Sequence, residues 1–576
     1  MREIAIRLPR TRLGELAAEQ LKDIALSGQF WLTAFTLLAA LLLGGGTRGG
    51  FLSDALLQLL AIPLLLLSAS RLGDLFWRQR AKLQEVRWEI IFCLAVVLVP
   101  LIQLVPLPPA RWTLLPHRAP LIASFDNLGH GLPWLPISVS PNATWLSVAA
   151  LLPTLAVFFG TILLGYRERR LLSLAVVAFG IVSAFLGLLQ IAQGPASRLR
   201  FFSATNLTEA VGFFANRNHY AAFLYVVLLV AAVWAIDIGF AVGPWRDRRI
   251  FEARSIVTIT ASFLAIVILL AAEAMARSRA GMILTMVSLV SVYGLALTDR
   301  RRRTLSATPL NFLFAAAGTA FILVVQFALY RVLARFNTDP LDDLRLQFAR
   351  TTIEAAWAYM PFGAGMATFV PVYGMFEKPA DLFAHAYINH AHDDILELWL
   401  ETGIFGIALM AAFAAWFVSR TIKIWRYAAV GANEFDRSLA RAATIAVALI
   451  VIHSFLDYPL RTAAMTAILA FACGLMVETL GIDDRAKERR ARPSFDTTAQ
   501  GTAPRVMAVS SAASPPAIGA EEELASSHQP PRQRPARWGD DVEWPEAWRK
   551  GGAGPGTGLK KTPAQTPSTP PDRDKI

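Results

Sequence analysis

Two histidines and two aspartates occur together in the segment NHAHDDILELWLETGIFG, which runs directly into an apolar stretch. They are His390, His392, Asp393 and Asp394. A neutral imidazole next to carboxylates is suited to accept a proton from a hydroxyl group near pH 7. The same residues also fit a divalent metal site, or a helix that starts in solvent with Asp393 as its N-cap. The spacing therefore leaves three roles open: a general base, a metal site and a capped helix start.

Polar side chains of a second kind stand in GFFANRNHYAAFL, at the beginning of another apolar stretch. Asn216, Arg217 and Asn218 can donate hydrogen bonds to sugar hydroxyls or to phosphate oxygens. Arg217 is therefore a candidate diphosphate ligand, and the two asparagines are candidate substrate-binding residues. The alternative is structural: Asn218 caps the helix that begins here, and the long Arg217 side chain reaches toward the membrane surface.

A third motif, EAMARSRAG, lies in a very short connection between two apolar stretches and carries Arg277 and Arg279. A guanidinium group binds a phosphate through paired hydrogen bonds and does not lose its charge. Both arginines are therefore candidate diphosphate ligands. Glu273 can orient one of them, and the plainer alternative is that Arg277 and Glu273 only form an ion pair four residues apart on one helix.

Three further residues are candidate substrate-binding groups. Arg345 lies in LDDLRLQFARTTIEAAWAYM, which has the apolar spacing of an amphipathic helix. Asp457 and Arg461, in HSFLDYPLR, are four residues apart, which predicts that they pair on one helical face. The segment PFGAGMATFVPVYG breaks the preceding helix, and its Gly363 and Gly365 predict positions where the backbone closely approaches another group.

The composition places these residues in a membrane protein. Of the 576 residues, 55% are hydrophobic and 17% are charged, and apolar stretches of about 17–25 residues recur, each long enough to cross a bilayer. We predict an all-α, polytopic bundle of about twelve transmembrane helices. The predicted spans are 30–45, 51–69, 88–106, 144–165, 171–193, 219–241, 255–275, 282–298, 309–330, 403–419, 440–460 and 462–479.

The net charge of +12 follows the loops and does not indicate a nucleic-acid partner. Arginines and lysines cluster after every second span, and the positive-inside rule makes these loops cytoplasmic. Both termini are then cytoplasmic, and the loops that carry the candidate site face outward. Cys93 and Cys473 both fall within predicted spans, so no disulfide framework is expected.

We divide the chain into three parts. Residues 1–29 are a cytoplasmic lead-in, in which 11–27 fits either an amphipathic helix on the membrane surface or a soluble segment. Residues 30–480 form the membrane domain, with a helical domain in its longest outward loop. Residues 481–576 are rich in Pro, Ala, Ser and Gly and are predicted to be a disordered cytoplasmic tail. The long outward loops are 107–143, 194–218 and 331–402.

The chemistry that fits these residues is group transfer from a lipid carrier. The sequence contains no Walker motif and no dinucleotide-binding fingerprint, and ATP is not expected on the outer side. We expect neither a cofactor nor a bound metal. A lipid-diphosphate sugar meets the need for an activated donor, because its leaving group carries the energy. Arginines would stabilise the charge on the diphosphate, and the histidine would deprotonate an acceptor hydroxyl.

A transporter or lipid flippase is the rival class, because many spans with charged residues also suit it. That class predicts charges near the bilayer midplane and repeated halves with interrupted helices. Here the charges gather at the outer ends of the spans, and the sequence has no visible internal symmetry. The pattern therefore favours an enzyme.

Taken together, GFFANRNHYAAF, the SRAG turn, PFGAGMATFVPVY, HAHDDILELWLETGIFG and HSFLDYPLR closely resemble the O-antigen ligase and O-antigen polymerase superfamily of bacterial inner-membrane proteins. The resemblance covers residues 30–480. It implies a multi-span glycosyltransferase of lipopolysaccharide or surface-polysaccharide biosynthesis, with a periplasmic site and an undecaprenyl-diphosphate-linked glycan as donor. It leaves three acceptors open: lipid A-core, as in a ligase; another lipid-linked glycan, as in a polymerase; and a protein Ser or Thr hydroxyl.

The resemblance also implies roles for single residues. In ligases of this family, periplasmic arginines bind the diphosphate and a histidine of the long loop activates the acceptor; the matching positions here are Arg279 and His392. Arg217 lies in the loop of the family's N-x-N motif and is the candidate for the second arginine. The family usually has Asn after this histidine, whereas this chain has Asp393, which either raises the basicity of His392 or indicates a different acceptor. His390 is the rival for the role of base.

Overall fold

The computed structural model describes most of the residues of the predicted membrane domain. The chain divides into two units, Met1–Ser494 and Phe495–Ile576, and every described residue belongs to the first. The predictions for the lead-in at 11–27, the span at 309–330 and the tail lie outside the described residues. The described ranges are 26–50, 52–129, 131–242, 253–302, 318, 341–379, 388–426 and 433–481.

The described part of the chain is helical and contains no β-strand, only an isolated bridge between Leu107 and Leu135. This confirms that the fold is all-α, as predicted. Each predicted span within the described residues coincides with a helix. The helices are α2 (Gly28–Leu43), α3 (Leu52–Arg78), α4 (Arg80–Glu85), α5 (Arg87–Gln103), α6 (Pro109–Trp112), α7 (Ala119–Asn127), α8 (Pro141–Ile162), α9 (Tyr166–Gln193), α10 (Arg217–Val242), α11 (Ala253–Ala276), α12 (Arg279–Arg302), α14 (Leu341–Ala358), α15 (Phe369–Phe376), α16 (Asp394–Arg426), α17 (Glu434–Ser454) and α18 (Ala463–Met476).

Seven of these helices are long and apolar enough to cross a membrane: α3, α8, α9, α10, α11, α12 and α16. The apolar helices α2 and α18 are shorter. Leu59, Leu66, Leu264 and Val290 on the long helices are exposed, as expected for side chains that face lipid. The chain is therefore a multi-pass membrane protein by the length and composition of its helices, while a total of twelve crossings is not confirmed.

Helix α10 lies at the centre of the bundle. Its side chains from Tyr220 to Val233 are buried, and it packs against α9, α11, α12 and α17. Small residues permit this packing: a Cβ atom on Gly180 of α9 would collide with the side chain of Val227. The beginning of α10 is therefore held firmly where the candidate residues of the GFFANRNHYAAFL motif lie.

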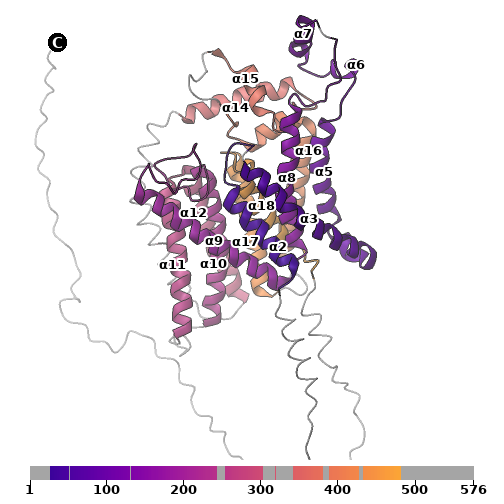
Figure 1. Ribbon diagram of the computed structural model, residues 1–576. Helices are drawn as coiled ribbons and strands as arrows, with labels where there is room; N and C mark the ends of the chain where they lie inside the picture. The colour runs from indigo at the N-terminus through magenta and orange to yellow at the C-terminus, as the bar shows by residue number, and fades with distance from the viewer. Residues whose placement is uncertain are drawn as a thin grey trace, which may run out of the picture. The chain divides into compact units, whose positions relative to one another are not determined.

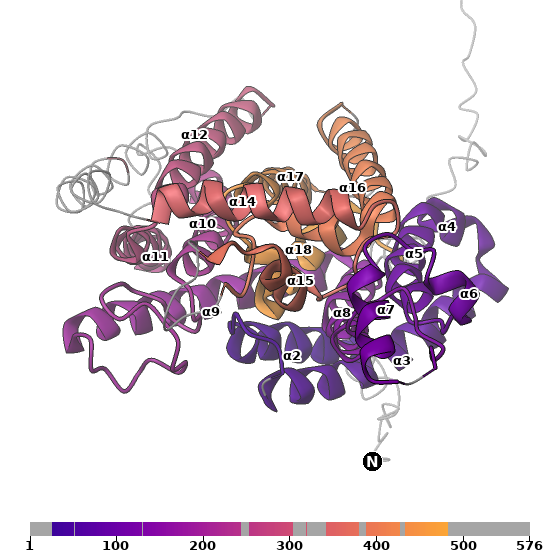
Figure 2. The same cartoon turned by 90° about the horizontal axis from the view of Figure 1, so that it is seen from above.

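Helices α14 and α15 lie across one end of the bundle, over α10, α17 and α18 (Figures 1 and 2). Together with the segment between them they form a cap, 341–376. Its apolar side chains, among them Phe348 and Tyr373, form a core that also takes in Leu400 of α16. The predicted order of helix, break and helix restart is confirmed, because α14 is followed by an irregular segment and α16 begins at Asp394. Since α10, α12 and α16 all begin at this end, we call it the capped end.

Helix α16 is broken at Gly403. Its φ and ψ angles are 59° and −138°, and a positive φ favours glycine. Just before the break, the carbonyl groups of Leu400 and Glu401 accept hydrogen bonds from the backbone N–H groups of Ala364 (3.0 Å) and Gly365 (2.9 Å). These hydrogen bonds connect the cap to α16 next to the break.

The close backbone approach predicted at the two cap glycines is confirmed. A Cβ atom on Gly363 would lie 2.5 Å from the carbonyl oxygen of Glu401, and one on Gly365 would lie 2.5 Å from Oγ of Ser138. Both glycines have positive φ angles, 76° and 114°. No other residue fits either position without displacing its neighbours.

Replacing Gly403 with alanine should destabilise the protein. The substitution puts a side chain at a positive φ and places its Cβ 2.7 Å from the backbone nitrogen of Gly363, so we expect a loss of at least about 1–3 kcal/mol. Thermal unfolding of the detergent-solubilised protein measures it. Gly73→Ala is the matched control: Gly73 lies within α3 and has open space around it, so the variant should be as stable as the wild type or slightly more stable. Equal melting temperatures for the two variants would contradict the prediction.

Candidate active site

The imidazole of His392 is held by a buried carboxylate. Its Nδ1 lies 3.1 Å from Oδ1 of Asp457, which follows the end of α17. The Asp457 side chain is 1% exposed, whereas that of His392 is 26% exposed. Because a carboxylate oxygen accepts from Nδ1–H, the neutral ring has its lone pair on Nε2. Among the described residues Nε2 has no hydrogen-bond partner, so it is available to take a proton.

Asp457 is held as a carboxylate by the groups around it. The side-chain amide of Asn218 on α10 donates to Oδ2, and the backbone N–H of Tyr458 donates to Oδ1 at 3.0 Å. Burial acts to raise the pKa of Asp457, but the hydrogen bond from His392 and nearby positive charge, including that of Arg345, bring it well below its usual range. The candidate Asn218 therefore positions Asp457, and Arg345 lies within electrostatic range of it.

The predicted ion pair between Asp457 and Arg461 is wrong. Helix α17 ends at Ser454, and the chain then turns into a short 3-10 helix at Pro459–Arg461. Residues four apart lie on one face only within a continuous helix, so the two side chains point to different partners here.

Three histidines surround the ring of Tyr458. His390 stacks on it with ring centroids 4.3 Å apart, while His392 and His219 meet it edge-on at 4.8 and 4.7 Å. Phe348 of α14 stacks on the His392 ring, with ring centroids 5.8 Å apart. His392 also has a positive φ of 55°, a conformation that surrounding structure must hold and that is common at functional sites. The cap and the bundle thus fix the His392 ring together.

His390, the rival candidate base, has both ring nitrogens in use. Nδ1 lies 3.0 Å from Oε1 of Glu397 and Nε2 lies 3.0 Å from the carbonyl oxygen of Thr47. Both partners accept hydrogen bonds, so the geometry fits a doubly protonated imidazolium. Burial alone would lower the pKa of His390, but the charge and hydrogen bond of Glu397 outweigh it and leave the pKa raised. The raised pKa favours the charged ring, and neither nitrogen of His390 is available to accept a proton.

Arg461 lies among three carboxylates on one face of α16. Its guanidinium nitrogens are 2.8 Å from Glu401, 3.4 Å from Glu397 and 3.6 Å from Asp394. Burial acts to lower the pKa of Arg461, and these carboxylates raise it above its usual value. The candidate substrate-binding residue Arg461 is thus occupied by the protein itself, and it ties α16 to the segment after α17.

The two aspartates of the histidine motif have separate structural partners. Oδ1 of Asp393 accepts from the backbone N–H groups of Ile395 (2.9 Å) and Leu396 (3.0 Å), which confirms Asp393 as the N-cap of α16. Asp394 accepts from the hydroxyl of Ser454 and the backbone N–H of Leu460. The described residues include no group of three His, Cys, Asp or Glu side chains that could hold a metal ion.

Arg217 is the first residue of α10, and its Nη1 lies 3.2 Å from Oε1 of the buried Glu209. The other candidate in this loop, Asn216, accepts from the backbone N–H of Asn218 at 2.8 Å. The structural role suggested for Asn218 therefore belongs to Asn216, while the Asn218 side chain points to Asp457.

The ion pair suggested between Arg277 and Glu273 is also wrong. Helix α11 ends at Ala276, and Arg277 has a φ of 50° and donates to the carbonyl of Thr208 at 3.3 Å. The Glu273 carboxyl is 2% exposed and neither oxygen has a hydrogen-bond partner among the residues described. Arg279, partly buried, is the first residue of α12.

The arginine candidates and His392 lie at the same end of the bundle. Contacts between Gly281 of α12 and Ala221 of α10 place the two helix beginnings side by side, and Asn218 links the beginning of α10 to the His392–Asp457 pair through Asp457. Helix beginnings carry partial positive charge and unpaired N–H groups. The capped end therefore combines three helix N-termini, a cluster of arginines and an imidazole, an arrangement that suits an anionic substrate.

Sequence reasoning missed several residues that hold this site together. Glu397 and Glu401 were not singled out, although with Asp394 they repeat at helical spacing on an apolar helix, a signal for a buried cationic partner. Arg169 and Arg170 belong to one of the basic clusters between spans, and the positive-inside rule accounts for them by topology alone. Arg169 is buried and donates to three backbone carbonyls at the ends of α8 and α18, and Arg170 forms a two-point ion pair with the Asp436 carboxylate.

Residues 264–432 match the family model described as O-antigen ligase. The matched segment includes Arg277, Arg279, His390 and His392, and it ends before Asp457. A search among curated proteins found no match to the chain.

Replacing Arg461 with methionine should strongly destabilise the protein, by about 3–5 kcal/mol, because it leaves buried carboxylates without their cation. Thermal unfolding in detergent measures the loss. Arg437→Met is the control: Arg437 pairs with the partly exposed Glu434 on one helical turn, so its loss should stay below about 1 kcal/mol. Adding Glu401→Gln to Arg461→Met should restore part of the stability. Similar melting temperatures for the two single variants would contradict the account.

The stability contributed by His390 should fall as pH rises. Its folded-state pKa is raised above the value of about 6.5 for an unfolded chain, so the contribution is complete below about pH 6.5 and is lost as the pH passes the folded-state pKa. The measurement is the difference in melting temperature between the wild type and His390→Asn from acid to alkaline pH. A difference that grows with pH would show that the ring is held in its neutral form.

Proposed function

We propose that the protein is a glycosyltransferase of glycan biosynthesis, a proposal supported by the match of residues 264–432 to the O-antigen ligase family model. It transfers a saccharide from an undecaprenyl-diphosphate-linked donor to an acceptor hydroxyl on the periplasmic side of the bacterial inner membrane. The observation that supports this most is the His392–Asp457 pair, in which a buried carboxylate orients an imidazole whose Nε2 has no partner among the described residues.

In the proposed reaction, Nε2 of His392 takes the proton of the acceptor hydroxyl while that oxygen attacks the anomeric carbon of the donor. A glycosidic bond forms, the bond between the anomeric carbon and the diphosphate oxygen breaks, and the diphosphate leaves on its lipid. Asp457 stabilises the imidazolium that results, because it is already a carboxylate 3.1 Å from Nδ1. The negative charge that develops on the diphosphate must be met by cations or N–H groups.

Arg279 is the first residue we assign to the diphosphate, with Arg277 and Arg217 beside it. Arg279 and Arg217 each begin a helix, α12 and α10, so the partial charge of the helix N-terminus adds to that of the guanidinium. Arg217 forms an ion pair with Glu209, so it contributes less positive charge to the diphosphate site. Arg345 of α14 in the cap lies within electrostatic range of Asp457, and we assign it to the saccharide.

The proposed orientation rests on the charges at the other end of the bundle. Arg169 and Arg170 lie in the first turns of α9, and Arg420, Lys423 and Arg426 lie in the last turns of α16, far along that helix from the end that carries His392. Basic residues favour the cytoplasmic side, which would turn the capped end toward the periplasm. A lipid-linked diphosphate can reach that end along the membrane surface.

Lipid A-core is the acceptor we propose, as in a ligase, and the test separates it from the other acceptor classes. Purified protein is incubated with a synthetic undecaprenyl-diphosphate glycan and, in parallel, with lipid A-core, with the glycan donor alone, or with a Ser/Thr peptide. Release of undecaprenyl diphosphate together with glycosylated lipid A-core supports the proposal. Lengthened lipid-linked glycan instead identifies a polymerase, and movement of the lipid across a bilayer without bond cleavage identifies a transporter.

Replacing His392 with alanine should lower kcat for transfer by about 10²–10⁴-fold, the usual contribution of a general base. The melting temperature should change little, because the side chain is a quarter exposed, at 26%. Release of undecaprenyl diphosphate measures the rate. His390→Asn tests the rival: activity that survives His392→Ala and disappears in a folded His390→Asn variant would reassign the base.

Replacing Arg279 with alanine should abolish transfer while the protein remains folded, and Arg279→Lys should keep a small part of the activity, because lysine supplies charge without two-point binding. Arg111→Ala is the matched control, since Arg111 is an exposed arginine of α6 outside the candidate site. Both are measured by release of undecaprenyl diphosphate. Full activity in Arg279→Ala would remove the proposed diphosphate site.

A further inference from the structure

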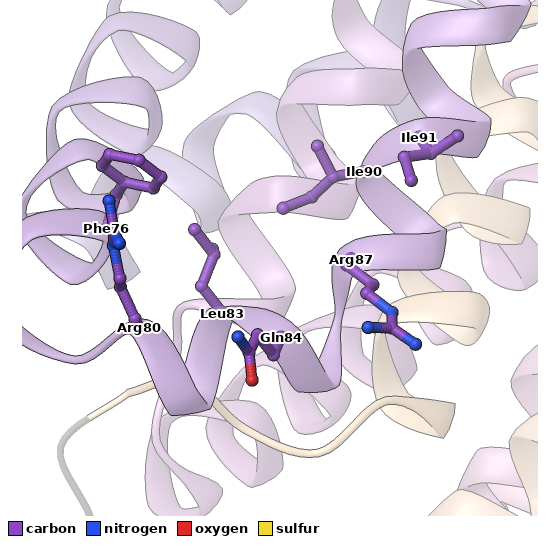
Figure 3. Close-up of a pocket in the computed structure, with 7 residues that line it drawn as sticks. All are labelled: Phe76, Arg80, Leu83, Gln84, Arg87, Ile90 and Ile91. Carbon is purple, nitrogen blue, oxygen red and sulfur yellow. The ribbon is translucent and has the colours of Figure 1, made fainter.

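Helices α3, α4 and α5 enclose a groove of about 480 Å³ at the end of the bundle opposite the capped end. The two ends of α5 fix this location. Gln103, at one end of the helix, donates to the carbonyl of Glu401 near the cap, whereas Arg87, at the other end, lines the groove. Figure 3 shows Leu83 and Gln84 between Arg80 on one side and Arg87 on the other. The remaining lining side chains are Phe76, Ile90 and Ile91.

The two arginines of this groove have aromatic neighbours and no acidic partner within the described residues. The guanidinium carbon of Arg80 lies 4.7 Å from the centre of the Phe76 ring, and that of Arg87 lies 5.1 Å from the Trp88 ring. The nearby buried carboxylate Glu89 is paired with Arg420 of α16. The groove thus has a positively charged arginine on each side and an apolar floor, formed by Phe76, Leu83 and Ile90, between them.

The residues around the groove have the pattern expected where lipid headgroups meet the hydrocarbon. Helix α3, a candidate membrane span, ends at Arg78. Trp77 and Trp88, on the two helices that flank the groove, are 81% and 62% exposed. Exposed tryptophans beside basic residues at the end of a span mark the membrane–water interface. A ligand in this groove therefore has its polar part among headgroups and its apolar part against lipid chains.

We propose that this groove binds an anionic phospholipid, with its phosphate between Arg80 and Arg87 and the upper part of its acyl chains on Phe76, Leu83 and Ile90. The two guanidinium groups supply the charge that a phosphodiester needs. The apolar floor supplies the contact that a free phosphate cannot use. The proposal does not depend on the transferase activity, because the groove lies at the other end of the bundle from His392.

The test is titration of the purified protein in neutral detergent with phosphatidylglycerol, with bound lipid measured by native mass spectrometry. Each basic residue at a membrane surface contributes about a fivefold change in affinity. We therefore expect about fivefold weaker binding for Arg80→Gln or Arg87→Gln alone and about 20–30-fold weaker binding for the double variant. The double variant Arg78→Gln/Lys82→Gln is the matched control: it removes the same charge from neighbouring residues that do not line the groove, and it should bind almost as well as the wild type.

Two parallel titrations identify the source of the phosphate. Phosphatidylcholine with the same acyl chains should bind more weakly than phosphatidylglycerol, and its binding should not respond to the arginine variants. Glycerol 3-phosphate should not displace the lipid. Equal weakening in the two double variants would overturn the proposal, because it would reduce the effect to general surface charge. Displacement by glycerol 3-phosphate would overturn it in favour of a soluble phosphate ligand.

Discussion

The structure of the capped end depends on one constraint: a carboxylate buried in a membrane protein must have a cationic or hydrogen-bonding partner. Asp394, Glu397 and Glu401 all lie on one face of α16 and are buried. Arg461, from the segment after α17, lies among all three, and the His390 imidazolium adds a second cation at Glu397. These charges join α16, α17 and the loop that carries His390 into one rigid unit.

The catalytic proposal follows from that unit. Arg461 and the Asp393 N-cap of α16 fix the two chain segments that meet at Tyr458. As a result, Nδ1 of His392 lies 3.1 Å from Oδ1 of Asp457. His390 serves as a structural cation, so His392 alone of the two presents a free ring nitrogen among the described residues. The cap then adds Phe348 against the same ring, and the break at Gly403 ties the cap to the membrane helix. Fold and proposed chemistry thus rest on the same contacts.

Patterns within a single segment predicted the structure well, and contacts between segments were predicted poorly. Hydropathy located the helices, and a local rule located the Asp393 N-cap, because both depend only on neighbouring residues. The glycine pattern marked Gly363 as a position of close approach, but it could not name Glu401 as the group approached. The pairing of Asp457 with Arg461 failed because it assumed a helix that ends at Ser454. The partners of Arg461 could not be derived, since they lie about sixty residues earlier in the chain, although three acids at helical spacing required some cation.

The central claim is that Asp457 holds His392 as the base of a glycosyl transfer, and Asp457→Asn tests it most directly. The substitution keeps the shape of the side chain and removes its charge, and Asp457→Ala serves as the second variant if the first is unstable. The measurement is the rate of undecaprenyl-diphosphate release with saturating acceptor, beside the melting temperature. The account predicts a fall of about 10²-fold or more in a folded variant. A rate within about twofold of the wild type in folded Asp457→Asn or Asp457→Ala would contradict it, because a general base contributes far more than twofold.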